Sequence, residues 1–242
     1  MSVGPAIWNE PWQDKIVLVN KPLKWTSFDV VNKLKYTWKL KTGHAGTLDP
    51  LGSGLLILCT GTKLKEMEQF KELDKSYSCS MVLGATTPSI DLETEIDQRF
   101  SIENISFEMI ESTAKKFIGE SLQIPPIHSA SKKDGVRYYK MARRGEEVTP
   151  LPKMVELKSL IITKIDLPEI HFELTCSKGF YVRSFVNDFG KALNNGAYLS
   201  SLCRTQIGNY KLVEANEIET LCSDIKTTRD NYYKSLPVIH PQ

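Results

Sequence analysis

The chain has 242 residues, 41% hydrophobic and 25% charged, and its 31 Lys and Arg stand against 29 Asp and Glu for a formal net charge of +2. This composition is typical of a globular protein with a buried core, and the near balance of charge excludes a uniformly basic nucleic-acid binder, so any such surface must be local. The five cysteines form no C-x-x-C pair and the four histidines fall at no metal-ligand spacing, which argues against a disulfide framework and a metal site. No apolar run is long enough to span a bilayer, so we expect a cytoplasmic protein without a membrane segment.

The first half of the chain alternates strand and helix patterns. Residues 16–19 are β-branched and predict a strand, whereas residues 28–40 carry apolar side chains at helical spacing. Residues 43–56 are rich in glycine and end in the apolar run 55–58, which predicts a loop that leads into a buried strand. The remaining patterns predict a helix over 63–73, a strand over 75–83, a polar loop over 84–97 and a helix over 107–118 that Gly119 closes.

The second half contains one strongly basic stretch. Residues 132–144 hold six Lys or Arg against a single Asp, with two tyrosines and a methionine interleaved. The other patterns predict an extended segment over 124–130, strands over 155–165 and 170–176, a helix over 180–193, a strand over 198–212, a helix over 214–224 and an irregular tail over about 226–242. We find no internal repeat or clear linker, so we expect a single domain over residues 1–242.

The glycine-rich segment 43–56 contains one carboxylate, Asp49, and one histidine, His44. Glycines let a backbone approach a ligand closely, so this is a segment where a side chain can be directed at a substrate. However, Asp followed by Pro also builds ordinary turns, and the residue types alone leave that structural role as an equal alternative.

Residues 43–56, GHAGTLDPLGSGLL, resemble the catalytic motif of the TruB-type tRNA pseudouridine-55 synthases, usually written G-H-x-G-x-L-D-P-x-A-x-G. Gly52 stands where many members have alanine, a change between small residues that we expect to be harmless. Other family segments follow in order at residues 19–22 (VNKP), 61–63 (GTK), 75–77 (KSY), 124–126 (IPP) with 129–130 (SA), and 177–183 (SKGFYVR). Together the matches cover roughly residues 15–210 and are far more specific than any single motif.

The resemblance implies an α/β (α+β) pseudouridine-synthase fold, in which helices flank a central mixed, mostly antiparallel sheet, with a thumb-like RNA-binding insertion at about 124–152. It also implies an intramolecular isomerase that converts uridine to pseudouridine at position 55 in the T-loop of tRNA. Such an enzyme breaks the bond between N1 and C1′, turns the base and rejoins it through C5. Because no water enters, one carboxylate in a dry pocket suffices, and we expect neither a cofactor nor a metal.

The family likeness assigns roles to six residues of the pocket. Asp49 is the expected nucleophile or base, Arg183 the arginine that pairs with it, and Tyr77 the aromatic ring that stacks on the target base. A tyrosine on the inner face of a strand is more often a core residue, so the residue alone favours packing for Tyr77. By the same likeness, His44 fills the space that the flipped uridine leaves, and two residues line the pocket, Tyr181 and Leu202.

The likeness also implies contacts with the RNA backbone. Lys21 and Lys63 resemble residues that meet phosphates or hold the pocket loops. The basic stretch resembles the family's thumb, which would close over the T-arm of tRNA through Lys132, Arg137, Arg143 and Arg144. A charge run is usually a solvated surface, but the interleaved aromatic residues favour RNA binding here.

Three further expectations concern the whole protein. The family usually appends a small C-terminal PUA domain, and residues 206–242 are too short for one, so we expect a short form that acts as a monomer without an obligatory protein partner. A tRNA-binding folding factor in which catalysis is secondary is the main alternative. A guide-RNA-dependent relative is disfavoured, because that relative depends on its PUA domain and partner proteins.

The loop around Asp91 departs from the family pattern but keeps the acidic position. The likeness therefore does not predict which residues this loop contacts.

Overall fold

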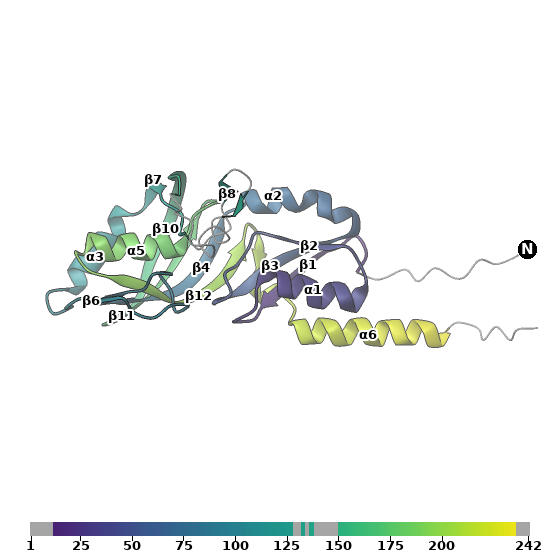
Figure 1. The fold of residues 1–242 in the computed structure, drawn as a ribbon. Helices are drawn as coiled ribbons and strands as arrows, with labels where there is room; N and C mark the ends of the chain where they lie inside the picture. The colour runs from purple at the N-terminus through teal and green to yellow at the C-terminus, as the bar shows by residue number, and fades with distance from the viewer. Residues whose placement is uncertain (1–11, 128–131, 134–135, 138–149, 236–242) are drawn as a thin grey trace, which may run out of the picture.

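The computed structural model describes residues 12–127, 132–133, 136–137 and 150–235, and these ranges form one large mixed sheet with helices around it (Figure 1). Seven strands follow one another across the sheet in the order β1, β3, β12, β4, β11, β10, β7, while β2 pairs with β3 and β13 with β12. The bounds are β1 Ile16–Lys21, β2 Thr42–Ala45, β3 Gly52–Thr60, β4 Lys75–Leu83, β7 Gly119–Gln123, β10 Lys153–Asp166, β11 Glu169–Cys176, β12 Ala197–Ile207 and β13 Tyr210–Lys211. Only β3 and β12 pair in parallel among these described strands, which confirms the predicted mixed, mostly antiparallel sheet.

One half of the sheet is covered on both faces. Leu56 and Leu58 of β3 pack with α1 (Ser27–Trp38) and α6 (Ile218–Ser235), while Leu55 and Ile57 point the other way, toward η1 (Gly61–Glu66) and α2 (Met67–Glu72). This arrangement explains why residues 55–58 form an uninterrupted apolar run, as predicted for a strand buried on two sides. The start of α1 is fixed by a capping box between Thr26 and Asp29, a motif that typically stabilises a helix by about 1 kcal/mol.

The other half of the sheet is covered by helices α3 (Phe107–Lys116) and α5 (Val182–Ala192), which lie together on one face (Figure 1). Their contact is aromatic: Phe185 of α5 packs edge-on against Phe117, with ring centroids 5.3 Å apart, and against Phe172 of β11 at 5.6 Å. Such pairs add roughly 0.5–1.5 kcal/mol each beyond the burial of their area. The N-terminus of α5 is thereby held rigidly against the sheet.

Several predicted elements differ from the structure. The helix predicted over 63–73 is divided into η1 and α2, and the glycine-rich segment begins with strand β2 rather than with a loop. Gly119, with φ of +108°, starts strand β7 instead of closing α3. Gly208 breaks the strand predicted over 198–212 into β12 and β13, followed by the short η2 (Leu212–Glu214). The loop over 84–97 is largely as predicted, with the two-residue strands β5 (Ala85–Thr86) and β6 (Gln98–Arg99) at its ends.

The predicted irregular tail is wrong over most of its length, because α6 continues to Ser235. Ile218, Leu221 and Ile225 are buried on this helix at helical spacing and anchor it against α1 and β1. Residues 236–242 of the predicted tail lie outside the described residues. Within the predicted thumb, the described backbone includes β8 (Lys132–Lys133) paired with β9 (Val136–Arg137). No helix in the described ranges is both long and apolar enough to cross a membrane.

Candidate active site

The site lies at the parallel seam between β3 and β12. Four residues form one row across the sheet there, because Lys21 of β1 faces Gly54 of β3, Gly54 faces Arg204 of β12, and Arg204 faces Tyr77 of β4. Gly54 has φ of +102°, and a Cβ on it would lie 2.4 Å from the carbonyl oxygen of Arg204. Only glycine therefore allows the two strands to meet at this point. Residues opposite one another point to the same face, so the row gathers Lys21, Arg204 and Tyr77 around the loop that precedes β3.

That loop, residues 46–51, carries Asp49 and is fixed on both sides of it. The buried hydroxyl of Ser27 accepts a hydrogen bond from the amide of Leu48 at 2.9 Å and donates one to its carbonyl at 3.2 Å. On the other side, the carbonyl of Pro50 accepts a bond from the backbone amide of Lys24 at 2.8 Å. The start of α1 and the residues before it therefore fix the backbone on both sides of Asp49.

Asp49 is paired with Arg183, as the sequence predicts. Arg183 is the second residue of α5, and its Nε and Nη2 each lie 2.9 Å from Oδ2 of Asp49. The arginine side chain is 4% exposed, whereas the aspartate is 34% exposed. A buried guanidinium bound through two nitrogens orients the carboxylate, which remains open to solvent and to a ligand.

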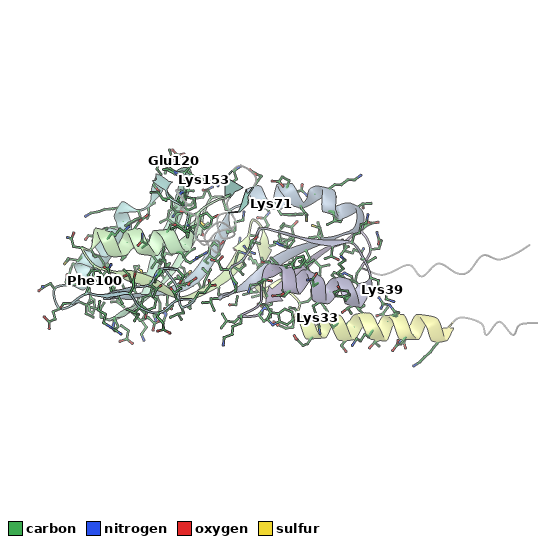
Figure 2. The ribbon with its side chains drawn as sticks, viewed as in Figure 1. Lys33, Lys39, Lys71, Phe100, Glu120 and Lys153 are labelled. Atoms are coloured by element: carbon green, nitrogen blue, oxygen red, sulfur yellow. The ribbon has the colours of Figure 1, made fainter. Side chains whose placement is uncertain are left out.

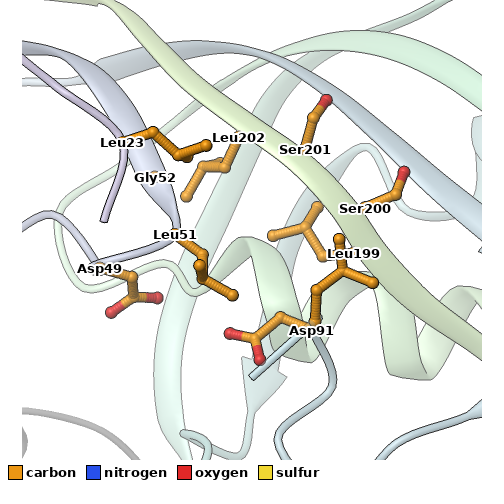
Figure 3. Close-up of a pocket in the computed structure, with 10 residues that line it drawn as sticks. Leu23, Asp49, Leu51, Gly52, Asp91, Leu199, Ser200, Ser201 and Leu202 are labelled. Atoms are coloured by element: carbon orange, nitrogen blue, oxygen red, sulfur yellow. The ribbon is translucent and has the colours of Figure 1, made fainter. Parts of the chain in front are cut away.

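The loop around Asp91 completes this arrangement. Asp91 is buried, and its Oδ2 lies 3.7 Å from Nε of Arg183, while the carbonyl of Ser89 accepts a hydrogen bond from Nη1 at 3.2 Å. Thr87 donates a hydrogen bond to the backbone carbonyl of Asp91 at 2.7 Å. Arg183 is thus held between two carboxylates, and both carboxylates line a small pocket of about 70 Å³ (Figure 3).

A much larger cleft of about 700 Å³ opens on Asp49. Tyr77 and Tyr181 line it with Asp49, so the structure brings together three residues that the sequence placed in one pocket. Five cationic residues also line the cleft against three acidic ones. The cationic residues are Lys71, Lys75, Lys153, Lys178 and Arg204, of which Lys71 and Lys153 are labelled in Figure 2. A cleft with this lining suits a polyanion such as a nucleic-acid strand.

Tyr77 presents its ring to the cleft in the protonated form. Burial raises the pKa of its phenol to about 12, and the neighbouring Arg204 opposes this rise through its charge and through side-chain hydrogen bonding. The hydroxyl therefore keeps its proton at neutral pH. A neutral aromatic ring in this position offers a flat apolar surface on which a base can stack.

Tyr181 is fixed through its backbone. Gln123, the last residue of β7, accepts a hydrogen bond from the amide of Tyr181 at 2.7 Å and donates one to its carbonyl at 3.1 Å. Because Tyr181 directly precedes α5, the same contact also fixes the start of the helix that carries Arg183. A single buried amide therefore sets the positions of two residues of the site.

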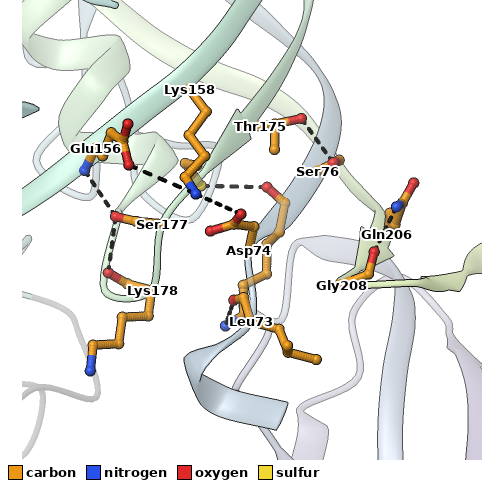
Figure 4. A network of polar contacts seen from close by, with 12 residues as sticks. Leu73, Asp74, Ser76, Glu156, Lys158, Thr175, Ser177, Lys178, Gln206 and Gly208 are labelled. Carbon is orange, nitrogen blue, oxygen red and sulfur yellow. Dashed lines mark hydrogen bonds and ion pairs between the residues drawn. The ribbon is translucent and has the colours of Figure 1, made fainter. Parts of the chain in front are cut away.

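The loop that leads to Tyr181 is tied to the strands beside it (Figure 4). The hydroxyl of Ser177 accepts a hydrogen bond from the amide of Glu156 at 2.8 Å, and Lys158 pairs with Asp74 at 2.8 Å. Lys178 in this loop pairs with Glu72 of α2. These contacts join β10 and the loop to α2 and the start of β4.

Lys21 does not fit the predicted phosphate contact, because its side chain is fully buried. Its Nζ donates hydrogen bonds to the carbonyls of Trp25 at 2.6 Å, Pro22 at 2.9 Å and Pro50 at 3.4 Å. Burial lowers the pKa of Lys21 to about 8. The geometry instead fits the other predicted role, in which this lysine holds the pocket loops.

Other predicted site residues are dispersed. Lys63 pairs with Glu66 on η1, and the two charged atoms are 2.5 Å apart. Neither Lys63 nor His44 on β2 is among the residues that line the cleft. Leu202 lines the small pocket with Asp49 (Figure 3). The side chains of Lys132 and Arg137, and the whole of Arg143 and Arg144, lie outside the described residues. Among the residues that the structure describes, no group of three or more His, Cys, Asp or Glu could hold a metal ion.

Sequence reasoning missed three residues that build the site, namely Ser27, Gln123 and Arg204. Arg204 had a detectable signal, since it is the one charged residue in a strand of apolar, small and uncharged polar residues, AYLSSLCRTQI. Ser27 and Gln123 had no such signal, because their partners in the site are backbone atoms.

The comparisons with known proteins agree with this fold. The model of the TruB family pseudouridylate synthase (N terminal domain) matches residues 33–182. The tRNA pseudouridine synthase B of Flavobacterium johnsoniae is 49% identical over 214 residues, which cover 85% of this chain and 93% of that protein. The protein of the same name from Phocaeicola vulgatus is 44% identical, with 86% and 92% covered.

A solved structure has the same fold. A chain in the crystal structure of a Cbf5-Nop10-Gar1 complex superposes with a TM-score of 0.72 at 24% identity, over 91% of this chain and 57% of that one. The family match and the relatives at 44% and 49% identity therefore define a pseudouridine synthase, an isomerase. The chain belongs to the TruB family of pseudouridylate synthases, which confirms the predicted family.

Proposed function

We propose that this protein isomerises uridine to pseudouridine at position 55 in the T-loop of tRNA, with Asp49 as the reacting group. The observation that carries the proposal is the pair between Asp49 and Arg183 beside a cation-lined cleft. The names of the similar proteins from Flavobacterium johnsoniae and Phocaeicola vulgatus support tRNA as the substrate. A protein that only folds RNA has no need for a carboxylate that a buried arginine holds in one direction.

The proposed reaction gains and loses no atoms. The Asp49 carboxylate either attacks C1′ or takes a proton from C2′, and the bond between N1 and C1′ breaks with its electron pair moving to the base. After the base turns, C5 bonds to C1′ while the bond from C1′ to Asp49 breaks or, on the other route, while the proton returns to C2′. C5 then loses its proton and N1 gains one. Tyr77 would keep the detached base stacked during the turn, and the walls of the cleft would exclude water that could intercept the sugar.

The cleft accounts for RNA binding in this proposal. Its volume of about 700 Å³ accommodates a nucleotide that has left its stack, which is required before an enzyme can act on a base. The exposed lysines Lys71 and Lys178 line the cleft, each paired with a glutamate of α2, and would turn to phosphates, which supply affinity but no sequence information. Specificity would then come from the shape of the T-arm and its unstacked loop bases.

We assign this activity to a cytoplasmic monomer that needs neither a cofactor nor a protein partner. All five cysteines are free thiols, which suits a reducing compartment. Size-exclusion chromatography with light scattering should give the mass of one chain alone and of one chain per RNA with a T-arm hairpin. A dimer in either sample would contradict this assignment.

The proposed substrate is tested with a T-arm hairpin RNA and a matched hairpin that has cytidine at position 55. Base-specific chemical labelling of pseudouridine should map one product, at position 55, in the first RNA and none in the second. Product at another uridine, or no product from the hairpin and from whole tRNA, would overturn the proposal.

A further inference from the structure

Arg204 is a buried cation at the centre of the site. Its side chain is 1% exposed, and no carboxylate of the described residues forms an ion pair with it. Burying a charge is costly unless hydrogen bonds compensate it, and a methionine or leucine in this strand would avoid that cost. The position therefore requires an explanation beyond packing.

The compensation comes from one segment. Nε of Arg204 donates a hydrogen bond to the carbonyl of Leu55 at 2.8 Å, and its two terminal nitrogens reach the carbonyls of Gly46 at 3.3 Å and Thr47 at 3.4 Å. Gly46 and Thr47 begin the loop that carries Asp49, and Leu55 lies in β3, beyond the end of that loop. The guanidinium thus joins the start of the Asp49 loop to strand β3. We call these three hydrogen bonds the clamp.

Arg204 is also paired with Tyr77, one of the tyrosines that line the cleft. Arg204 and Tyr77 are opposite one another on β12 and β4, so both point to the cleft side of the sheet, and both line the cleft. Arg204 therefore links two parts of the site that must keep a fixed separation, because it binds the Asp49 loop and is paired with Tyr77 across the strands.

We propose that Arg204 is a positioning residue for the isomerisation proposed above, because it holds the Asp49 loop at a fixed distance from the ring of Tyr77. The inference rests on that proposed function for its activity test. A displacement of about 1 Å in a reacting group can slow a reaction about 100-fold without weakening substrate binding. Loss of Arg204 should accordingly slow the chemical step and leave RNA binding largely unchanged.

The test compares Arg204→Met and Arg204→Lys with wild type and with Arg99→Met, a matched loss of an exposed arginine on β6. In single-turnover reactions with the T-arm hairpin, we expect Arg204→Met to be about 100-fold slower and Arg204→Lys about tenfold slower, with dissociation constants for the RNA within about threefold of wild type. Lysine keeps the charge but lacks the planar fork that reaches three carbonyls, so it should restore the rate only in part. Arg99→Met should match wild type.

A second measurement does not depend on activity. Amide hydrogen exchange of residues 46–55 should be faster in both Arg204 variants and unchanged in Arg99→Met, because the clamp is lost while the fold remains. Normal exchange in this segment, or a rate within about threefold of wild type for Arg204→Lys, would overturn the inference. If wild type itself makes no pseudouridine, the proposed function fails, and the exchange data still decide whether Arg204 holds the loop.

Discussion

Arg183 binds one oxygen of Asp49 through two nitrogens, each 2.9 Å away, and its Nε lies 3.7 Å from the buried carboxylate of Asp91. One guanidinium therefore binds an aspartate that opens on the cleft and also lies beside a second aspartate that is buried. This arrangement makes Arg183 important for stability as well as for orientation, and the two effects can be separated.

Replacement of Arg183 with methionine should lower the free energy of unfolding by about 3 kcal/mol, because Asp91 is left buried beside an apolar side chain. In the double variant Arg183→Met with Asp91→Asn, the buried charge is gone and most of that stability should return. Activity should be lost in both variants, since Asp49 is no longer oriented. Urea unfolding measures the first effect, and equal stabilities of the single and double variants would contradict the account.

Lys21 should make stability depend on pH. Burial lowers its pKa from 10.5 to about 8, so the folded protein releases this proton near pH 8 while the unfolded chain keeps it to a much higher pH. Between those values the unfolded state binds more protons, and raising the pH therefore favours the folded state. Relative to Lys21→Met, wild type should gain roughly 2 kcal/mol of unfolding free energy between about pH 8 and pH 10.

Unfolding in urea at several pH values provides this comparison. Lys75 is also buried, with a pKa lowered to about 8, but it is present in both proteins and its contribution cancels in the difference. A difference between wild type and Lys21→Met that stays constant across this range would show that Lys21 keeps its proton in the folded protein.

The residues that sequence reasoning found are those that lie in the motifs of the TruB family. Asp49 and Arg183 have complementary charges, and Tyr77 belongs to a strand whose predicted bounds, 75–83, agree with β4. The two-sided burial of residues 55–58 also followed from their composition. The meeting of Asp49, Arg183 and Tyr77 in one place could be expected because their motifs recur in order along the chain.

The residues that were missed act on the backbone. Gln123 and Arg204 bind carbonyl and amide groups, which every residue has, so no partner in the sequence reveals them. The family likeness gave Lys21 two possible roles, contact with phosphates or support of the pocket loops, and its place opposite Gly54 puts it beneath the loop. Strand β7 lacks the alternation of a typical strand and forms through its pairing with β10.

Gly54 should tolerate no side chain, for a steric reason that can be isolated. It has φ of +102°, and a Cβ would lie 2.4 Å from a backbone oxygen of β12, whereas Gly119 has φ of +108° and nothing within 4 Å of the same position. Both substitutions by alanine carry the backbone strain of a positive φ, about 1–2 kcal/mol. Gly54→Ala should cost a further 1–3 kcal/mol or so from the clash, and it should also slow turnover by shifting Arg204. Equal losses of stability in the two variants, measured in urea, would contradict the close approach of β3 and β12.

The most direct test of the central claim is the activity of Asp49→Asn on the T-arm hairpin. Glu111→Gln is the matched control, because it removes an exposed carboxylate on α3 that does not line the cleft. The account predicts that Asp49→Asn binds the RNA with nearly the affinity of wild type and makes no detectable pseudouridine, while Glu111→Gln remains active. Pseudouridine formation by Asp49→Asn at a rate near that of wild type would show that Asp49 is not the reacting group, and would favour the role of an RNA-folding factor.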